Sequence, residues 1–192
     1  MSTLKIVVSS TRPGRIGAAI GAWVAERART VGAFDRVEIL DLAEIALPLF
    51  DEPHHPRSGQ YTQPHTQAWA AAVADADALV ITTPEYNHSF PATIKNALDY
   101  LHAEWRDKAL GLVGYGGVSG GRGAVQGLTT VTDALGLVQV EPVALVKAMT
   151  FVVEGEFLGS EQDAAAVDAM ITQLADLDRE LAPRRSAAAL VS

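Results

Sequence analysis

A flat heterocyclic ligand could be bound by residues 84–91, which have the sequence Pro-Glu-Tyr-Asn-His-Ser-Phe-Pro. Proline at both ends stiffens this segment, so the backbone N–H and C=O groups between them point in defined directions. Such a backbone edge can read the alternating donors and acceptors of a ring, while Tyr86 contacts ring atoms or a substrate and Asn87 holds the turn. The alternative is a turn in which Tyr86 and Phe90 are buried and Glu85 is solvated. The candidate ring-binding residues are Pro84, Glu85, Tyr86, Asn87 and Ser89.

Residues 9–17, Ser-Ser-Thr-Arg-Pro-Gly-Arg-Ile-Gly, have the chemistry of a phosphate site. They offer three hydroxyls, two guanidinium groups and the free amides of a helix start, where the partial positive charge favours an anion. The segment contains neither the Gly-Lys-Ser/Thr of a nucleotide-triphosphate loop nor a complete G-x-G-x-x-G. The alternative is an ordinary turn with exposed arginines. The candidate phosphate-binding residues are Ser10, Thr11, Arg12, Arg15, Ile16 and Gly17.

Residues 114–123 form a third segment of this kind, in which six of ten residues are glycine. Glycine is costly to order, so this composition favours a purpose such as close backbone approach to a ligand. Consecutive amides could stabilise negative charge that develops on a ligand during reduction. The alternative is a mobile loop without a ligand. The candidate residues are Gly116, Gly117 and Ser119.

Alternating apolar segments must position these three loops. Runs of β-branched and apolar residues predict strands at 4–9, 37–40, 78–83, 109–115 and 138–146, the last irregular at Pro142. Helical periodicity predicts helices at 16–31, 67–76, 92–101, 122–135 and 167–181. Four prolines within 48–64 predict a long surface loop there. Residues 1–183 are expected to form one domain, with 184–192 a frayed tail after Pro183.

The alternation of strands and helices predicts an α/β protein with a five-stranded, doubly wound parallel sheet and helices on both faces. The three loops follow the first, third and fourth strands. Those strands lie side by side in the flavodoxin-like order 2-1-3-4-5, which would bring the loops to one crevice at the carboxyl ends of the strands. The loop positions therefore favour that order over the dinucleotide-binding one.

Composition excludes several other functions. A net charge of −8 argues against nucleic-acid binding, which needs a basic face. No apolar stretch is long enough to cross a bilayer, and the first residues do not form a signal peptide. The absence of cysteine excludes disulfides and thiolate metal sites and fits a cytoplasmic protein. His54, His55 and His65 lack the ligand spacing of a zinc site, so no metal is expected.

The chain resembles the NAD(P)H-dependent FMN reductase family of flavodoxin-like proteins, which includes quinone, azo and chromate reductases. The resemblance extends from Leu4 to about Leu181, with Ser9 standing where the family usually has glycine. The residues that carry it are Ser10-Thr11-Arg12 with Gly14 and Arg15, Pro84 to Asn87 with Ser89, Pro91, Lys95, Asn96 and Asp99, and the glycine pairs at 116–117 and 120–121.

The resemblance implies bound FMN, with its phosphate in the loop at 9–17 and its ring between the other two loops. It also implies ping-pong hydride transfer from NADPH or NADH to FMN, a quinone or a similar small acceptor. The flavin itself carries the chemistry, so no catalytic acid or base is assigned. A homodimer or homotetramer, with the flavin near the subunit interface, is a further implication.

Two other functions are considered. A flavodoxin-like electron carrier or flavin-binding module would bind FMN without needing a nicotinamide. A serine hydrolase is suggested because residues 117–121 fit G-x-S-x-G between a strand and a helix. In that fold the catalytic histidine follows the serine, and no histidine follows His102 in this chain. The hydrolase is therefore disfavoured.

Overall fold

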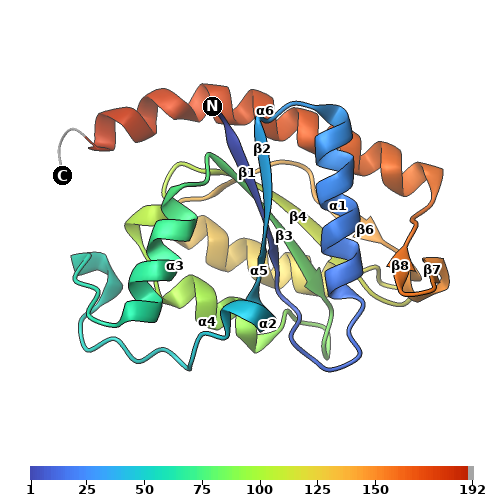
Figure 1. The fold of residues 1–192 in the computed structure, drawn as a ribbon, viewed down its shortest axis with the longest axis horizontal. Coiled ribbons are helices and arrows are strands. Elements are labelled where there is room, and N and C mark those ends of the chain that lie inside the picture. Colours follow the sequence, from blue (N-terminus) through green and yellow to red (C-terminus); the bar gives the residue numbers. More distant parts are fainter. Residues whose placement is uncertain (190–192) are drawn as a thin grey trace.

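A parallel β-sheet forms the centre of the molecule in the computed structural model, which describes residues 1–189 (Figure 1). The strands stand in the order β2-β1-β3-β4-β5, and β6 also pairs with β4. This confirms the flavodoxin-like order 2-1-3-4-5. The strands are β1 (Thr3–Val8), β2 (Arg36–Asp41), β3 (Ala78–Pro84), β4 (Ala109–Tyr115), β5 (Val138–Gln139) and β6 (Val143–Leu145).

The predicted fifth strand is divided at Pro142, as its irregularity indicated. Its first part pairs Val138 with Ala109, and its second pairs Val143 with Val113, both on β4. Proline cannot donate to a strand ladder and is tolerated mainly at a sheet edge. The break therefore falls on the outermost strand, where it costs few hydrogen bonds.

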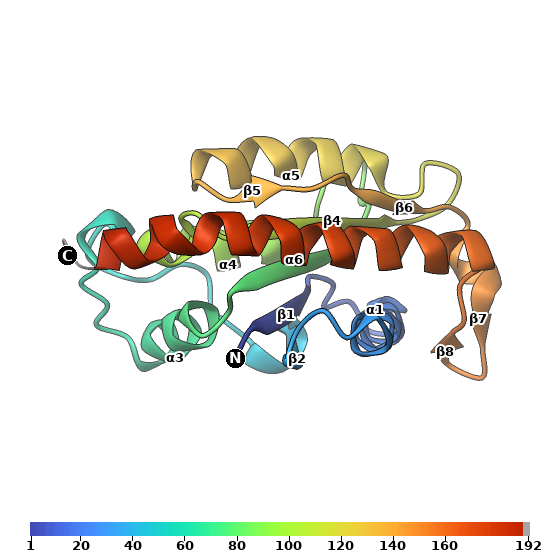
Figure 2. The ribbon, with the colours of Figure 1, turned by 90° about the horizontal axis from the view of Figure 1, so that it is seen from above.

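Helices cover both faces of the sheet (Figure 2). One hydrophobic core lies between the sheet and the pair α1 and α6, and a second lies between the sheet and α3, α4 and α5. No helix among residues 1–189 is long and apolar enough to span a membrane. The helices are α1 (Gly17–Val31), α2 (Leu42–Ile45), α3 (Pro64–Ala74), α4 (Ala92–Asp99), α5 (Arg122–Ala134) and α6 (Glu161–Ala189), with short 3₁₀ helices at Pro56–Ser58, Ala103–Trp105 and Ala148–Phe151.

Close packing explains why the strands are so apolar. Every residue of β1, β3 and β4 is buried. Gly111 on β4 lets α6 approach closely, because a Cβ there would lie 2.9 Å from the sulfur of Met170. The central strands are thus fixed on both faces, and their carboxyl ends form a rigid base for the loops that follow them.

Two features depart from the sequence predictions. Where a frayed tail was expected after Pro183, α6 continues through the proline to Ala189, whereas residues 190–192 lie outside the described part. The guanidinium of Arg185 pairs with Asp178 and donates to the carbonyl of Asp107 at 2.9 Å, which holds the helix beyond the proline. In addition, β7 (Val152–Val153) and β8 (Glu156–Phe157) form a small antiparallel hairpin that was not predicted.

Candidate functional site

Three loops meet at the carboxyl ends of adjacent strands, as predicted. We call residues 9–17 after β1 the first loop, 84–91 after β3 the second, and 114–123 at the end of β4 the third. The first loop contacts α4, which follows the second loop, because the Thr93 hydroxyl donates to the Ser9 carbonyl. The second and third loops are joined by Glu85, which accepts a hydrogen bond from the Gly123 amide at 2.8 Å. All the predicted site residues therefore lie in one connected set of loops.

The first loop leads into a helix whose amino end has no side-chain cap. Ile16 is the capping residue, and the first turn of α1 contains no acidic residue. The unpaired N–H groups of that turn and its partial positive charge can therefore receive an anion. Thr11 and Arg12 are exposed beside it. The only hydrogen bond that the described residues give the Arg12 guanidinium is to the carbonyl of Pro13, at 3.2 Å.

Arg15 occupies a different environment from Arg12. Its Nη2 lies 2.7 Å from Oδ2 of the buried Asp41, and its Nη1 donates to the Ser10 carbonyl at 2.9 Å. The same aspartate caps α2 by accepting from the Ala43 amide at 3.0 Å. Arg15 thus fixes the shape of the first loop with its charge already balanced, whereas the charge of Arg12 faces solvent.

Buried hydroxyls without partners lie beneath the first loop. The side-chain oxygens of Ser9, Ser10 and Tyr115 are buried, and none has a hydrogen-bond partner among the described residues. A Cβ added to Gly17 would lie 2.0 Å from Ser10 Oγ and 2.5 Å from the Tyr115 hydroxyl. Only glycine fits at the start of α1 for this reason. Unsatisfied buried hydroxyls are rare and point to a missing ligand or water.

Tyr115 is a site residue that the sequence reasoning missed. Its burial raises the pKa of the phenol to about 12, so the hydroxyl stays protonated at neutral pH. Tyr115 is an aromatic residue at the end of an apolar strand, and aromatic residues in such positions are most often part of the core. Its position immediately before a glycine pair was the one available signal.

The second loop is a tight turn. Tyr86 and Ser89 exchange two backbone hydrogen bonds of 2.8 and 3.0 Å. Asn87 and His88 between them both have positive φ, 51° and 62°, which is the pattern of a type I′ turn. Asparagine adopts this conformation more readily than most residues, so Asn87 holds the turn as expected. Tyr86 is 37% exposed, which excludes the alternative that it is a buried core residue.

The Glu85 side chain is neither solvated nor free to face a ligand. The side chain is 8% exposed, and its carboxylate lies against the first turn of α5. Burial alone would disfavour the charged form, but hydrogen bonds from the Gly123 and Ala124 amides and the Ser119 hydroxyl outweigh it and lower the pKa of Glu85. His88 Nδ1 lies 3.4 Å from the other carboxylate oxygen. The structure thus uses Glu85 to join two loops.

The third loop is held in place by its own backbone. The Gly117 and Gly116 carbonyls accept from the Lys147 and Ala148 amides at 2.8 and 3.1 Å. Gly121 has a φ of 83°, and a Cβ there would lie 2.3 Å from the backbone nitrogen of Tyr115. At Gly117, by contrast, a Cβ would meet no atom within 4 Å. The loop is therefore ordered, and Gly117 leaves a bare backbone surface next to Gly116, whose Cβ position lies 3.9 Å from Glu85 of the second loop.

The geometry does not provide a hydrolase. In the described part of the chain, no histidine forms a hydrogen bond or ion pair with Ser119, so the G-x-S-x-G segment lacks a base. Within residues 1–189 there is also no group of three or more histidine, aspartate or glutamate side chains that could hold a metal ion. His55 instead accepts from the Arg57 amide, and His65 pairs with Asp51 at 2.9 Å.

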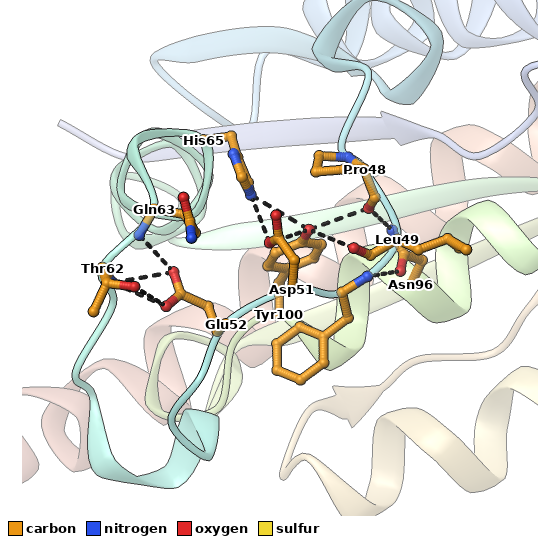
Figure 3. Close-up of polar contacts among 10 residues, drawn as sticks. Pro48, Leu49, Asp51, Glu52, Thr62, Gln63, His65, Asn96 and Tyr100 are labelled. Atoms are coloured by element: carbon orange, nitrogen blue, oxygen red, sulfur yellow. Dashed lines mark hydrogen bonds and ion pairs between the residues drawn. The ribbon is translucent and has the colours of Figure 1, made fainter.

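The long surface loop is fastened to α4 and α3 (Figure 3). Asn96 accepts from the Phe50 amide at 2.9 Å and donates to the Pro48 carbonyl at 2.7 Å, while the Tyr100 hydroxyl donates to Pro48 and Asp51. Glu52 accepts from the backbone amides of Thr62 and Gln63. These bonds outweigh the opposing effect of burial and lower the pKa of Glu52 to about 2. The loop thus has a fixed course beside the helix that follows the second loop.

These residues fit a flavin mononucleotide. A phosphate needs donors and positive charge, which the uncapped start of α1, Arg12 and the Ser10 hydroxyl can supply. A ring needs rigid backbone edges, which the type I′ turn and the bare surface at Gly117 can supply. The two sets of groups stand at neighbouring strand ends, which is where ligands bind in open α/β sheets.

Comparisons with known proteins point to the same cofactor. The model of the family described as NADPH-dependent FMN reductase matches residues 2–150. An NAD(P)H-dependent FMN reductase of Schizosaccharomyces pombe is 43% identical over 123 residues, 63% of this chain and 61% of that protein. A 2-hydroxy-1,4-benzoquinone reductase of Burkholderia sp. is 32% identical over 108 residues, 56% of this chain and 54% of that protein. More than a third of each relative thus lies outside the alignment.

A solved structure shares the fold. The flavoenzyme NAD(P)H:(acceptor) oxidoreductase FerB from Paracoccus denitrificans is similar with a TM-score of 0.73, over 94% of this chain and 98% of that one, at 21% identity. The family match covers well over half of the sequence and includes all three loops. The chain belongs to the NADPH-dependent FMN reductase family.

Proposed function

We propose that the protein is an FMN-dependent oxidoreductase, which takes hydride from NADPH or NADH and passes two electrons to a quinone or similar small acceptor by a ping-pong mechanism. The observation that carries the proposal is the first loop, where the uncapped start of α1, Arg12 and the unpartnered Ser10 hydroxyl come together at the carboxyl ends of the strands. The names of the relatives from S. pombe and Burkholderia support the reductant and the acceptor class.

The proposed roles follow the geometry of the loops. Ser10, Thr11, Arg12, Ile16 and Gly17 hold the phosphate, and Arg15 keeps the first loop in shape through Asp41. The backbone of Pro84, Tyr86, Asn87 and Ser89 binds the ring on one side, with Gly116, Gly117 and Ser119 opposite and Glu85 joining the two loops. When bound, the flavin supplies the hydride chemistry. The protein's part is to position the nicotinamide and acceptor and to provide the electrostatics around the ring.

The visible absorption spectrum of the purified protein, before and after anaerobic addition of NADPH, tests this proposal. A flavin band that bleaches is the expected result. A band that stays unchanged with both NADPH and NADH would favour an electron carrier. If no flavin appears even after reconstitution with FMN, the proposed function is wrong.

We further propose that residues 1–183 form a single FMN-binding domain and that the protein is a cytoplasmic homodimer or homotetramer. The resemblance to the family supports the single domain and the oligomeric state, and the lack of cysteine supports the cytoplasmic location. Leu49 is 84% exposed and Phe50 39%, on a loop with a fixed course, which suits a surface that contacts another subunit. Light scattering on the FMN-loaded protein should give the mass of a dimer or tetramer, and a monomer mass would contradict the proposal.

A further inference from the structure

Tyr115 and Ser10 form a pair of buried hydroxyls at the start of α1. Tyr115 is 4% exposed and Ser10 1% exposed. Both oxygens lie within 2.5 Å of the point where Gly17 would carry a Cβ, so they are neighbours, and Ser10 is close enough to oppose the rise that burial causes in the pKa of Tyr115. Neither oxygen, however, makes a hydrogen bond of normal geometry to any described residue. They come from different strands, Tyr115 from the end of β4 and Ser10 from beyond β1. The fold has therefore brought two buried hydroxyls together at the start of α1.

A buried hydroxyl without a partner loses the hydrogen bonds that it made to water, at a cost of about 1–3 kcal/mol. A phenylalanine at 115 would avoid that cost and fill the same space. Each hydroxyl has one hydrogen to donate. When two hydroxyls lie side by side, the first can donate its hydrogen to the second, but the second must find another acceptor for its own hydrogen. The pair is therefore complete only when an external acceptor receives the remaining hydrogen.

The surroundings of the two hydroxyls indicate which of them donates to the other. The Tyr115 ring belongs to the core that α1 and α6 share, so its hydroxyl approaches the first loop from beneath. Ser10 lies within the loop, next to the uncapped helix start. The phenol is protonated at neutral pH, and burial raises its pKa further, to about 12, so it can act as the inner donor.

We propose that Tyr115 is a positioning residue of the phosphate site: its hydroxyl donates to Ser10 Oγ and so directs the Ser10 hydroxyl to donate to the phosphate of FMN. This inference rests on the proposed function. It assigns to a core residue of β4 a part in distinguishing FMN from riboflavin, which has the same ring but no phosphate. A chain of hydrogen bonds that ends on an anion strengthens each member.

Quenching of flavin fluorescence by the apoprotein tests the inference through dissociation constants rather than turnover. The constants for FMN and for riboflavin are measured on the wild type, Y115F, S10A and the double variant. Y115F should raise the constant for FMN about tenfold, the effect of one hydrogen bond, and leave that for riboflavin unchanged. In the S10A background, Y115F should cause no further loss, because Tyr115 acts through Ser10.

Y100F is the matched control. Tyr100 is also fully buried, and its hydroxyl donates to Pro48 and Asp51 on the long surface loop instead. Y100F should leave the dissociation constant for FMN unchanged. Circular dichroism melting should show that apo Y115F is about as stable as the wild type, because without FMN the hydrogen bond to Ser10 is offset by the cost of burying two hydroxyls whose bonds are incomplete. If Y115F nevertheless fails to fold, the inference is wrong, because the hydroxyl then has a structural role.

Three other results would overturn the inference while the proposed function stands. Y115F could leave FMN binding unchanged, weaken FMN and riboflavin equally, or add its full effect to that of S10A. A wild-type protein that binds neither flavin would overturn the proposed function and this inference together.

Discussion

Arg12 and Arg15 are three residues apart but differ in what they contact. Arg12 is exposed and its charge has no carboxylate partner in the described part of the chain, whereas Arg15 pairs with the buried Asp41. R12A should weaken FMN binding about tenfold or more, as expected for a lost charge-assisted hydrogen bond, with little change in melting temperature. R15A should lower the melting temperature as well, because Asp41 would be left buried without its partner. Flavin content and thermal unfolding of the two variants provide the measurements. Unchanged flavin content in R12A would contradict the phosphate assignment.

The glycines of the site also differ in what a side chain would meet. A Cβ at Gly17 would overlap Ser10 Oγ and the Tyr115 hydroxyl, whereas one at Gly117 would meet nothing within 4 Å. G17A should therefore lower both the melting temperature and the affinity for FMN. G117A should keep the melting temperature and weaken only flavin binding, because its methyl group would project where the ring is proposed to lie. Equal melting temperatures for the two variants would contradict this packing.

At the scale of elements, one carboxylate contributes strongly to holding the long loop. Glu52 has a pKa of about 2 in the folded protein against an ordinary value of 4.5, because backbone amides bind its charged form. Its stabilisation is therefore complete above about pH 4.5 and is lost as the pH falls towards 2. E52Q should lower the free energy of unfolding at pH 7 by on the order of 2 kcal/mol. Urea unfolding of both proteins should show this difference shrinking between pH 4.5 and 2, and a constant difference would rule out the charge as its cause.

Elements fixed by local pattern were predictable, and those fixed by distant contacts were not. The strand order followed from small polar residues after three strands, and Pro142 marked the break in the fifth strand. The continuation of α6 past Pro183 depends on Arg185 reaching Asp107, which is remote in sequence. The same distinction applies to the site. The three loops could be predicted from the sequence, but the ion pair of Arg15 with Asp41 and the hydrogen bond of Glu85 with Gly123 join residues that are distant in sequence and became visible only in the folded chain.

At the scale of the whole molecule, α6 completes the core that α1 begins. Val167, Ile171 and Leu174 are fully buried against the sheet, although they lie beyond the residues that match the family model. A fragment of residues 1–150 should therefore fail to fold, even though it contains all three loops, because β4 and β6 would lose the helix that covers them on one face. Circular dichroism and flavin binding of the fragment provide the measurement. A cooperative unfolding transition would contradict the expectation.

The position of α6 also has a consequence for biosynthesis. While a ribosome is still making α6, the sheet and its ligand loops already exist as sequence, but the helix that covers β4 does not. This core can therefore close only after Leu181 has emerged from the ribosome. Nascent chains would expose an apolar sheet face during that interval, and are the form most in need of a chaperone.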